Sequence, residues 1–352
     1  MDAFYLKLTI MDSPINCRFL RRFGIELEVN TLTGIIQRPN TEGGEIPVGS
    51  DYVARIVHKT TGDKVILQGW EHIHNNTGWI IKPDSSCGIE INSPILKGWS
   101  GLGKILRVID GLRIAGVNAD RRCSLHVHVN IADLSPTQLA SVIAHYIKCE
   151  HVLFDAIPPY RKNNRYCQLL GLTDLFSHDF TMEPMDLIHR VSGVKYYSLN
   201  AYHFVRGGGF SEDNYRKKTL EFRIAEGAAC IDPLLAKNWI RFFLHFVEMT
   251  KNRPLPGNYR SGDQWSSLLW LDPKEVFSLL KFDNDDLMTP GLKQVRDWFM
   301  HRIAENGYNT GLRGIWSNQG RSAAREDIEG LVGTLKPQGV EDDPVYGKNY
   351  IL

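Results

Sequence analysis

Four short segments of the chain each place two polar side chains two residues apart within an otherwise apolar stretch. These pairs are Glu26 and Glu28 in FGIELEVN, Glu90 and Asn92 in GIEINSP, His126 and His128 in SLHVHVN, and Glu221 and Arg223 in TLEFRIAEG. Residues i and i+2 of a β-strand lie on the same face of a sheet. Buried glutamates side by side repel one another unless a positive charge lies between them. Because converging carboxylates and imidazoles are typical metal ligands, the pattern indicates an enzyme that handles a divalent cation and a charged substrate.

Each pair also has a plainer interpretation when it is considered alone. A Glu-x-Glu pair on a half-exposed strand is common, with its glutamates in water. A single strand histidine usually has a structural role, and Glu221 with Arg223 would form an ordinary salt bridge. Asp84 and Ser86, in the tight turn before Glu90, suit turn formation as well as ligand binding. The metal-site interpretation therefore depends on the four pairs occurring together.

Several other classes of protein are disfavoured by the sequence. There is no H-E-x-x-H motif, and the six cysteines include no C-x-x-C pair, which argues against zinc-protease, zinc-ribbon and redox-motif chemistry. We also expect no thiol nucleophile at Cys87 or Cys167. The three glycines at 207–209 match neither a P-loop nor a dinucleotide fingerprint, so we expect a turn there.

The formal charge of +1 gives no reason to expect nucleic acid as a partner. No apolar stretch reaches the roughly 18 residues of a membrane span, so no membrane partner is expected. The opening MDAFYLKLTIMDSP lacks the basic region and apolar run of a signal peptide. A cytoplasmic protein with reduced thiols fits these features best.

Hydrophobic periodicity predicts a domain of mixed helices and strands over residues 1–250, followed by a helical appendage at 251–335 and a tail at 336–352. An insertion at about 31–78 is expected to contain a hairpin that turns at Thr61-Gly62-Asp63, and segment 158–190 is expected to be irregular. Strands are predicted at 20–30, 79–82, 88–92 and 124–130, and in YYSLNAYHFV and TLEFRIA. Helices are predicted at 100–115, from the Ser135 capping box to about Phe154, at 233–249, from Asp272, at 290–305 and at 321–333.

The middle of the chain is rich in cationic side chains. An irregular stretch with this composition is suited to binding phosphate groups, although each residue alone is equally explained as part of a solvated loop. The residues are Arg161, Arg165, Lys195 and Arg206, together with Tyr166.

Six motifs in a fixed order resemble those of the amidoligase family, which belongs to the carboxylate–amine ligase superfamily of glutamine synthetase and glutamate–cysteine ligase. They are FGIELE, DSSCGIEINSP, LHVHV, RKNNRYC, KYYSLN and EFR. The resemblance covers residues 20–250. It is weaker at RRCS, where we expect a glycine-rich lead to LHVHV, and at 31–78 and 168–190, which match nothing specific and therefore leave the substrates unidentified.

The resemblance implies an α+β fold: a curved, mostly antiparallel sheet of the glutamine synthetase and glutamate–cysteine ligase type with outer helices. ATP would phosphorylate a small-molecule or peptide carboxylate, and an amine would attack the resulting acyl phosphate to form an amide or peptide bond. Two alternatives remain open, a phosphotransferase on the same fold and a catalytically silent binding module. The sequence also leaves the oligomeric state open.

The resemblance further implies roles for individual residues. The ligands of Mg²⁺ or Mn²⁺ would be Glu26, Glu28, Glu90, His126 and Glu221. The nucleotide and its phosphates would be contacted by His128, Lys195, Arg161 and Asn200. The acyl phosphate would be formed and held by Arg223, Arg165 and Glu221.

Overall fold

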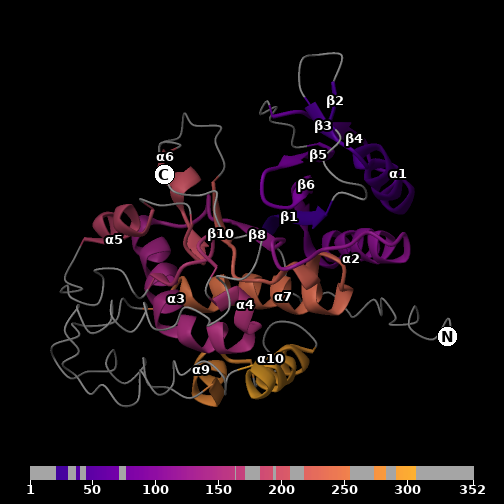
Figure 1. The fold of residues 1–352 in the computed structure, drawn as a ribbon. Coiled ribbons are helices and arrows are strands. Elements are labelled where there is room, and N and C mark those ends of the chain that lie inside the picture. Colours follow the sequence, from indigo (N-terminus) through magenta and orange to yellow (C-terminus); the bar gives the residue numbers. More distant parts are fainter. Residues whose placement is uncertain are drawn as a thin grey trace.

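An open sheet of eight strands forms the centre of the protein (Figure 1). The computed structural model describes residues 21–30, 37–39, 45–70, 77–162, 164–170, 183–192, 196–206, 218–253, 273–282 and 291–306. In the order of the sheet, the strands are β4 (Val65–Leu67), β5 (Trp79–Asp84), β6 (Gly88–Asn92), β1 (Arg22–Asn30), β8 (Leu125–Asn130), β10 (Thr219–Phe222) and β9 (Leu199–Asn200), while β7 (Leu96–Lys97) also pairs with β1. All pairs are antiparallel except β4 with β5. A mixed fold with a mostly antiparallel sheet is therefore confirmed, and the glutamine synthetase type stays a prediction.

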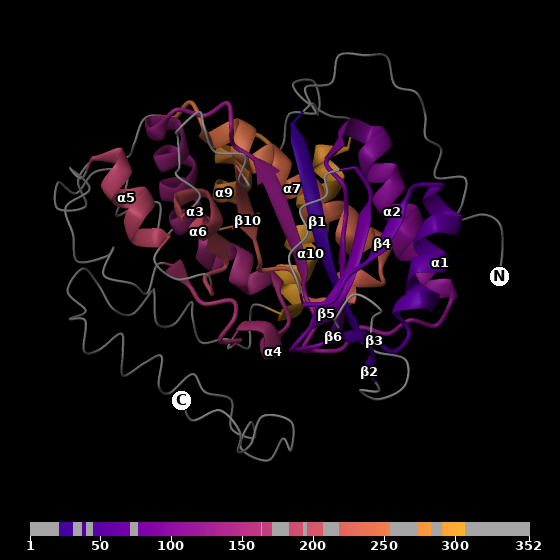
Figure 2. The same ribbon diagram turned by 90° about the horizontal axis from the view of Figure 1, so that it is seen from above.

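One face of the sheet is apolar and is covered by helices. On β1, Phe23, Ile25, Leu27 and Val29 are at most 2% exposed. Helix α7 (Pro233–Thr250) lies behind the sheet, with α2 (Gly98–Ile114) and α3 (Pro136–Ala156) beside it (Figure 2). The ring of Phe222 on β10 stacks on a phenylalanine of α7, with 4.3 Å between the ring centroids. Because side chains alternate along a strand, the polar residues must point to the opposite face.

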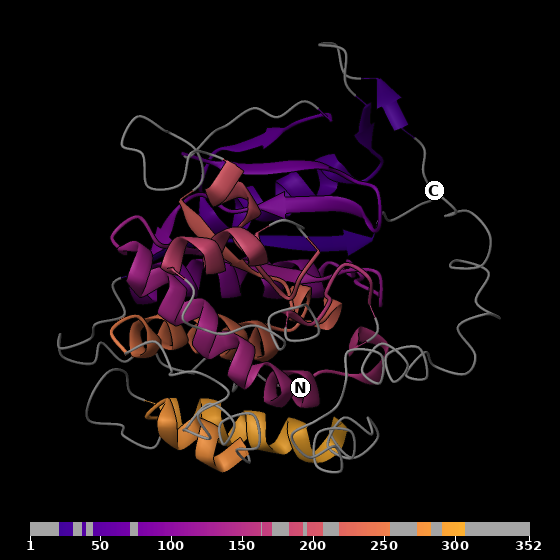
Figure 3. The same cartoon turned by 90° about the vertical axis from the view of Figure 1, so that its left-hand side faces the viewer.

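Two further helices form a layer beyond α3 and α7 (Figure 3). They are α9 (Pro273–Leu279) and α10 (Leu292–Asn306), which confirms helices near 272 and 290–305. The ring of Phe299 on α10 lies edge-on to Trp239 of α7, with 4.8 Å between centroids. The expected helix at 321–333 and the tail lie outside the described residues. The division of the chain at residue 250 stays a prediction.

The predicted end of α2 at Gly116 and the predicted start of α3 at Ser135 are confirmed. Ser135 and Gln138 form the expected capping box, in which the Ser135 hydroxyl accepts from the Gln138 N–H at 3.2 Å and the Gln138 side chain accepts from the Ser135 N–H at 2.9 Å. Gly116, just beyond α2, has a φ of 75°. That left-handed conformation favours glycine and ends the helix.

The expected hairpin around Thr61-Gly62-Asp63 is wrong. Residues Ser50–Thr61 form helix α1, and Gly62 caps it with a φ of 73°. Val53 and Val57 are both fully buried, and a spacing of four residues places them on one side of a helix. The hairpin of this region lies earlier, between the short strands β2 (Gln37–Pro39) and β3 (Glu45–Pro47).

The segment YYSLNAYHFV is only partly a strand. After the two residues of β9, Tyr202–Arg206 form helix α6, because the Asn200 side chain accepts from the N–H of Tyr202 at 2.7 Å and turns the chain. The segment predicted to be irregular contains two short helices, α4 (Pro159–Lys162) and α5 (Pro184–Val191). The three glycines at 207–209 lie outside the described residues. Among the helices described, none has the length and apolar character needed to cross a bilayer.

His245 of α7 makes the stability of the fold sensitive to acid. Its Nε2 donates to the carbonyl of Leu280 at 2.8 Å, and burial, helped by the charge of Arg241, lowers its pKa to about 4. An unfolded histidine takes up a proton near pH 6.5, whereas the folded one does not until about pH 4. Acidification between these values therefore favours the unfolded chain, by about 1.4 kcal/mol per pH unit.

We accordingly expect His245→Asn to reduce the loss of unfolding free energy between pH 6.5 and 4.5, measured by urea denaturation across that range. The exposed histidine of α10 provides the matched control, since His301→Asn should keep the wild-type slope. Identical slopes in wild type and His245→Asn would contradict the assignment.

Candidate active site

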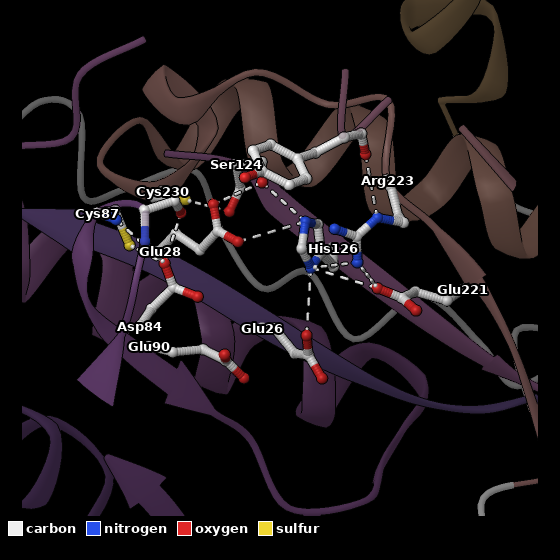
Figure 4. A network of polar contacts seen from close by, with 12 residues as sticks. Glu26, Glu28, Asp84, Cys87, Glu90, Ser124, His126, Glu221, Arg223 and Cys230 are labelled. Atoms are coloured by element: carbon white, nitrogen blue, oxygen red, sulfur yellow. Dashed lines mark hydrogen bonds and ion pairs between the residues drawn. The ribbon is translucent and has the colours of Figure 1, made fainter. Parts of the chain in front are cut away.

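Members of all four polar pairs gather on one face of the sheet, as Glu26, Glu28, Glu90, His126, Glu221 and Arg223 show (Figure 4). The register places Glu26 of β1 between Asn92 of β6 and His126 of β8. It also places Glu28 opposite Glu90, and Glu221 of β10 between His128 and Asn200. The four expected pairs therefore lie side by side, on four adjacent strands.

Glu26, His128 and Glu221 form a group that is suited to holding a cation. One ligand atom from each residue lies within 4.8 Å of the others, and no second group of this kind occurs among the described residues. Nε2 of His128 is 2.9 Å from a Glu26 oxygen, yet it forms no hydrogen bond, because the contact lacks the necessary geometry. A buried nitrogen without a hydrogen bond beside two carboxylates fits a metal ligand. Two carboxylates with one imidazole suit Mg²⁺ or Mn²⁺.

The ring of His126 lies between three glutamates, which are Glu26, Glu28 and Glu221. Its Nδ1 is 3.2 Å from Glu26 and 3.3 Å from Glu221, and its Nε2 is 2.7 Å from the hydroxyl of Ser124. That hydroxyl also donates to Glu28 at 2.6 Å, so it joins Glu28 to His126. Burial and the charge of Arg223 lower the pKa of His126, which favours the neutral ring, and its Nδ1 lies within hydrogen-bonding distance of Glu26.

The carboxyl groups of the cluster differ in charge. Burial and the nearby Asp84 raise the pKa of Glu28 to about 8, and burial and Glu26 raise that of Glu90 to about 7. Burial also acts to raise the pKa of Glu221, but Arg223 and the two histidines outweigh it and lower the value to about 2. Glu221 is therefore ionised at neutral pH while Glu28 is largely protonated, and a divalent cation would favour ionisation of both.

Arg223 presents a fixed guanidinium at the edge of the cluster. Its Nη1 donates to Glu221, and its Nε lies 3.4 Å from the carbonyl of Tyr166. Burial acts to lower its pKa, but the surrounding glutamates raise it, so the side chain stays charged. Arg161, only 1% exposed, donates to the backbone carbonyl of Arg223 at 2.5 Å and so holds this segment in place.

Three predicted site residues remain to be placed, which are Asn200, Arg165 and Lys195. Asn200 donates to Glu221 at 2.8 Å and fixes the orientation of that carboxylate. Arg165 is exposed, with its guanidinium 4.6 Å from the centre of the Tyr166 ring. Lys195 lies outside the described residues.

Two residues of the site were missed by the sequence analysis. Ser124 joins Glu28 to His126, and no pattern in the sequence marks it. Nζ of Lys82 lies 2.9 Å from Glu90. The alternation of WIIKPD does place Lys82 and Asp84 on one face of a strand, which would have been the signal.

The thiols of the two motif cysteines are poor nucleophiles. A hydrogen bond with Cys123, together with burial, raises the pKa of Cys87, and burial raises that of Cys167. Both thiols therefore stay protonated near neutral pH. This supports the expectation that the chemistry does not use a thiol.

We expect Ser124→Ala to lower the free energy of unfolding by about 1–3 kcal/mol. The variant lacks the hydroxyl that contacts both Glu28 and His126, so a buried polar atom of each loses its hydrogen-bond partner. Urea denaturation at pH 7.5 measures the change. Ser100→Ala, at an exposed position of α2, is the matched control and should change stability by less than about 0.5 kcal/mol. Equal stabilities for the two variants would show that the bridge contributes nothing measurable.

The part of the chain that contains this polar cluster also matches a known protein family. The sequence model of the family described as "Putative amidoligase enzyme" matches residues 20–247, more than half of the chain. The matched region begins before β1 and ends within α7, so it contains the whole polar cluster. No curated protein matches the chain. From the family match we conclude that the chain belongs to the amidoligase family, a family of enzymes.

Proposed function

We propose that the protein is an ATP-dependent ligase that uses Mg²⁺ or Mn²⁺ and joins a carboxylate to an amine through an acyl phosphate. The observation that carries the proposal is the group of Glu26, His128 and Glu221 beside the fixed guanidinium of Arg223. Membership of the amidoligase family supports a ligase-type function. Phosphoryl transfer depends chiefly on positioning and on charge neutralisation, and this cluster offers groups for both.

Glu26, His128 and Glu221 would hold the cation, which when bound neutralises charge on the phosphate oxygens. This gives His128 the metal-ligand role that the family resemblance implied for His126. His126 instead contacts Glu26 and Glu221 through one ring nitrogen and Ser124 through the other, so we assign it to orienting the ligand carboxylates.

Arg223 is the group proposed to bind the transferred phosphoryl group. In the first step an oxygen of the substrate carboxylate attacks the γ-phosphorus, the bond to the bridging oxygen breaks, and ADP leaves. In the second step the amine nitrogen attacks the acyl carbon, the bond to the phosphate oxygen breaks, and the nitrogen loses a proton. The forked guanidinium of Arg223 suits a phosphoryl group through both steps, because it donates two parallel hydrogen bonds.

The reaction is tested by ADP release with ATP and Mg²⁺ against pooled carboxylic acids and pooled amines. We expect turnover only when both pools are present, and its loss in Glu26→Gln and Glu221→Gln, which remove charge from the cation-binding group. Glu305→Gln, an exposed glutamate of α10, is the control and should keep full activity. ADP release with one pool alone, together with a stable phosphorylated product, would instead establish a phosphotransferase.

Arg223→Ala should lower kcat by about 10²–10³-fold while changing ATP affinity much less, because the partner charge develops mainly in the transition state. Steady-state kinetics and calorimetric ATP binding give the two values. Arg107→Ala, at an exposed position of α2, is the control. An equal loss of ATP binding and turnover in Arg223→Ala would make this arginine a ground-state nucleotide contact.

A further inference from the structure

Lys82 lies on the opposite side of the acidic cluster from Arg223. It belongs to β5, directly opposite Glu90 of β6, whereas Arg223 follows β10 on the other side of β1 and β8. The ammonium of Lys82 is 2.9 Å from Oε1 of Glu90, and the same oxygen accepts from the side chain of Asn92 at 2.9 Å. Glu90 therefore already has a cationic partner and an amide donor.

The ammonium of Lys82 stays charged in this setting. Burial acts to lower its pKa, but Glu90, Glu26 and Asp84 outweigh that effect and raise it. The side chain is 20% exposed, so it contacts the carboxylate of Glu90 while remaining partly accessible to solvent. A lysine ammonium is a compact charge with three N–H donors, and a single contact with Glu90 uses one of them.

Glu90 is not part of the group whose ligand atoms converge. That group consists of Glu26, His128 and Glu221, on the three strands β1, β8 and β10. A second divalent cation at Glu90 would have to displace the ammonium of Lys82 or lie beside it, where like charges repel. Figure 4 shows Glu90 and Arg223 on opposite sides of Glu26.

We propose that Lys82 takes the place of a second divalent cation in this site: it neutralises Glu90 in the free protein and binds the phosphate groups of the nucleotide during the reaction. The second half of this inference rests on the ATP-dependent reaction proposed above. One divalent cation, Lys82 and Arg223 then surround the transferred phosphoryl group with three positive centres, of which the protein itself supplies two.

The first test counts bound cations without nucleotide. Electron paramagnetic resonance of free Mn²⁺ during a titration gives the number of ions bound per chain. We expect one ion in the wild type, one in Glu90→Gln and none in Glu221→Gln. Two ions in the wild type, with one lost in Glu90→Gln, would overturn the proposal, because Glu90 would then be a metal ligand.

The second test measures nucleotide binding by calorimetry in the presence of Mn²⁺, with a non-hydrolysable ATP analogue that has an imido β,γ-bridge. Lys82→Met should weaken binding by about 10- to 100-fold, the effect of losing one charge-assisted contact. Lys82→Arg keeps the charge and should stay within a few-fold of the wild type. Lys59→Met, at an exposed position of α1, is the matched control and should bind as the wild type does.

Wild-type affinity in Lys82→Met would overturn the phosphate-binding role of Lys82. Failure of the ATP dependence itself gives a different result, namely a wild-type protein that binds no ATP analogue at all. In that event the phosphate-binding role falls with the ligase proposal, while the Mn²⁺ count still decides whether Lys82 replaces a cation at Glu90.

Discussion

Three glutamates on one buried face of a sheet repel one another, and the site is organised around that repulsion. Glu26, Glu28 and Glu221 all contact or approach the single imidazole of His126. Each has a further close contact, which is with His128 for Glu26, with Ser124 for Glu28 and with Arg223 for Glu221. Because low-dielectric surroundings penalise every uncompensated charge, removal of one partner changes the protonation of the others.

The apolar face of the sheet makes this arrangement rigid. Phe222 follows Glu221 directly and is fully buried, with its ring stacked on Phe243 of α7. Since neighbouring residues of a strand point to opposite faces, packing on one side sets the height and direction of the carboxylate on the other. The same coupling holds on β1, where Ile25 and Leu27 flank Glu26 and are at most 2% exposed. The aromatic core thus contributes to the geometry of the site without touching it.

The strands and the convergence of the polar pairs were predictable because the alternation of FGIELEV and LHVHV is a local property with a period of two. Two errors came from segments in which local pattern was ambiguous. The run VARIV is rich in β-branched residues, which favours a strand. In the structure it lies in the middle of a helix, whose buried side contains Val53 and Val57. The segment after Asn200 turns into a helix through one side-chain hydrogen bond.

Other features depend on information that a single sequence does not contain. Lys82 is part of the site because β5 and β6 pair in a particular register, and Ser124 because the chain before β8 passes close to Glu28. The choice between the two histidines is similar. The register sets His126 opposite Glu26, yet the ligand atoms that converge are those of His128, because side-chain direction decides which atoms meet.

The order of strands in the sheet has a consequence for biosynthesis. Glu26 lies near the start of the chain and Glu221 almost two hundred residues later, on strands separated in the sheet by β8 alone. A nascent chain that has not yet produced β10 lacks both Glu221 and Arg223, so it lacks part of the proposed cation site. Closing such long-range contacts is entropically costly and late in folding. A cation at the proposed site would therefore have all of its ligands only after β10 has paired with β8, so its binding would report a completed sheet.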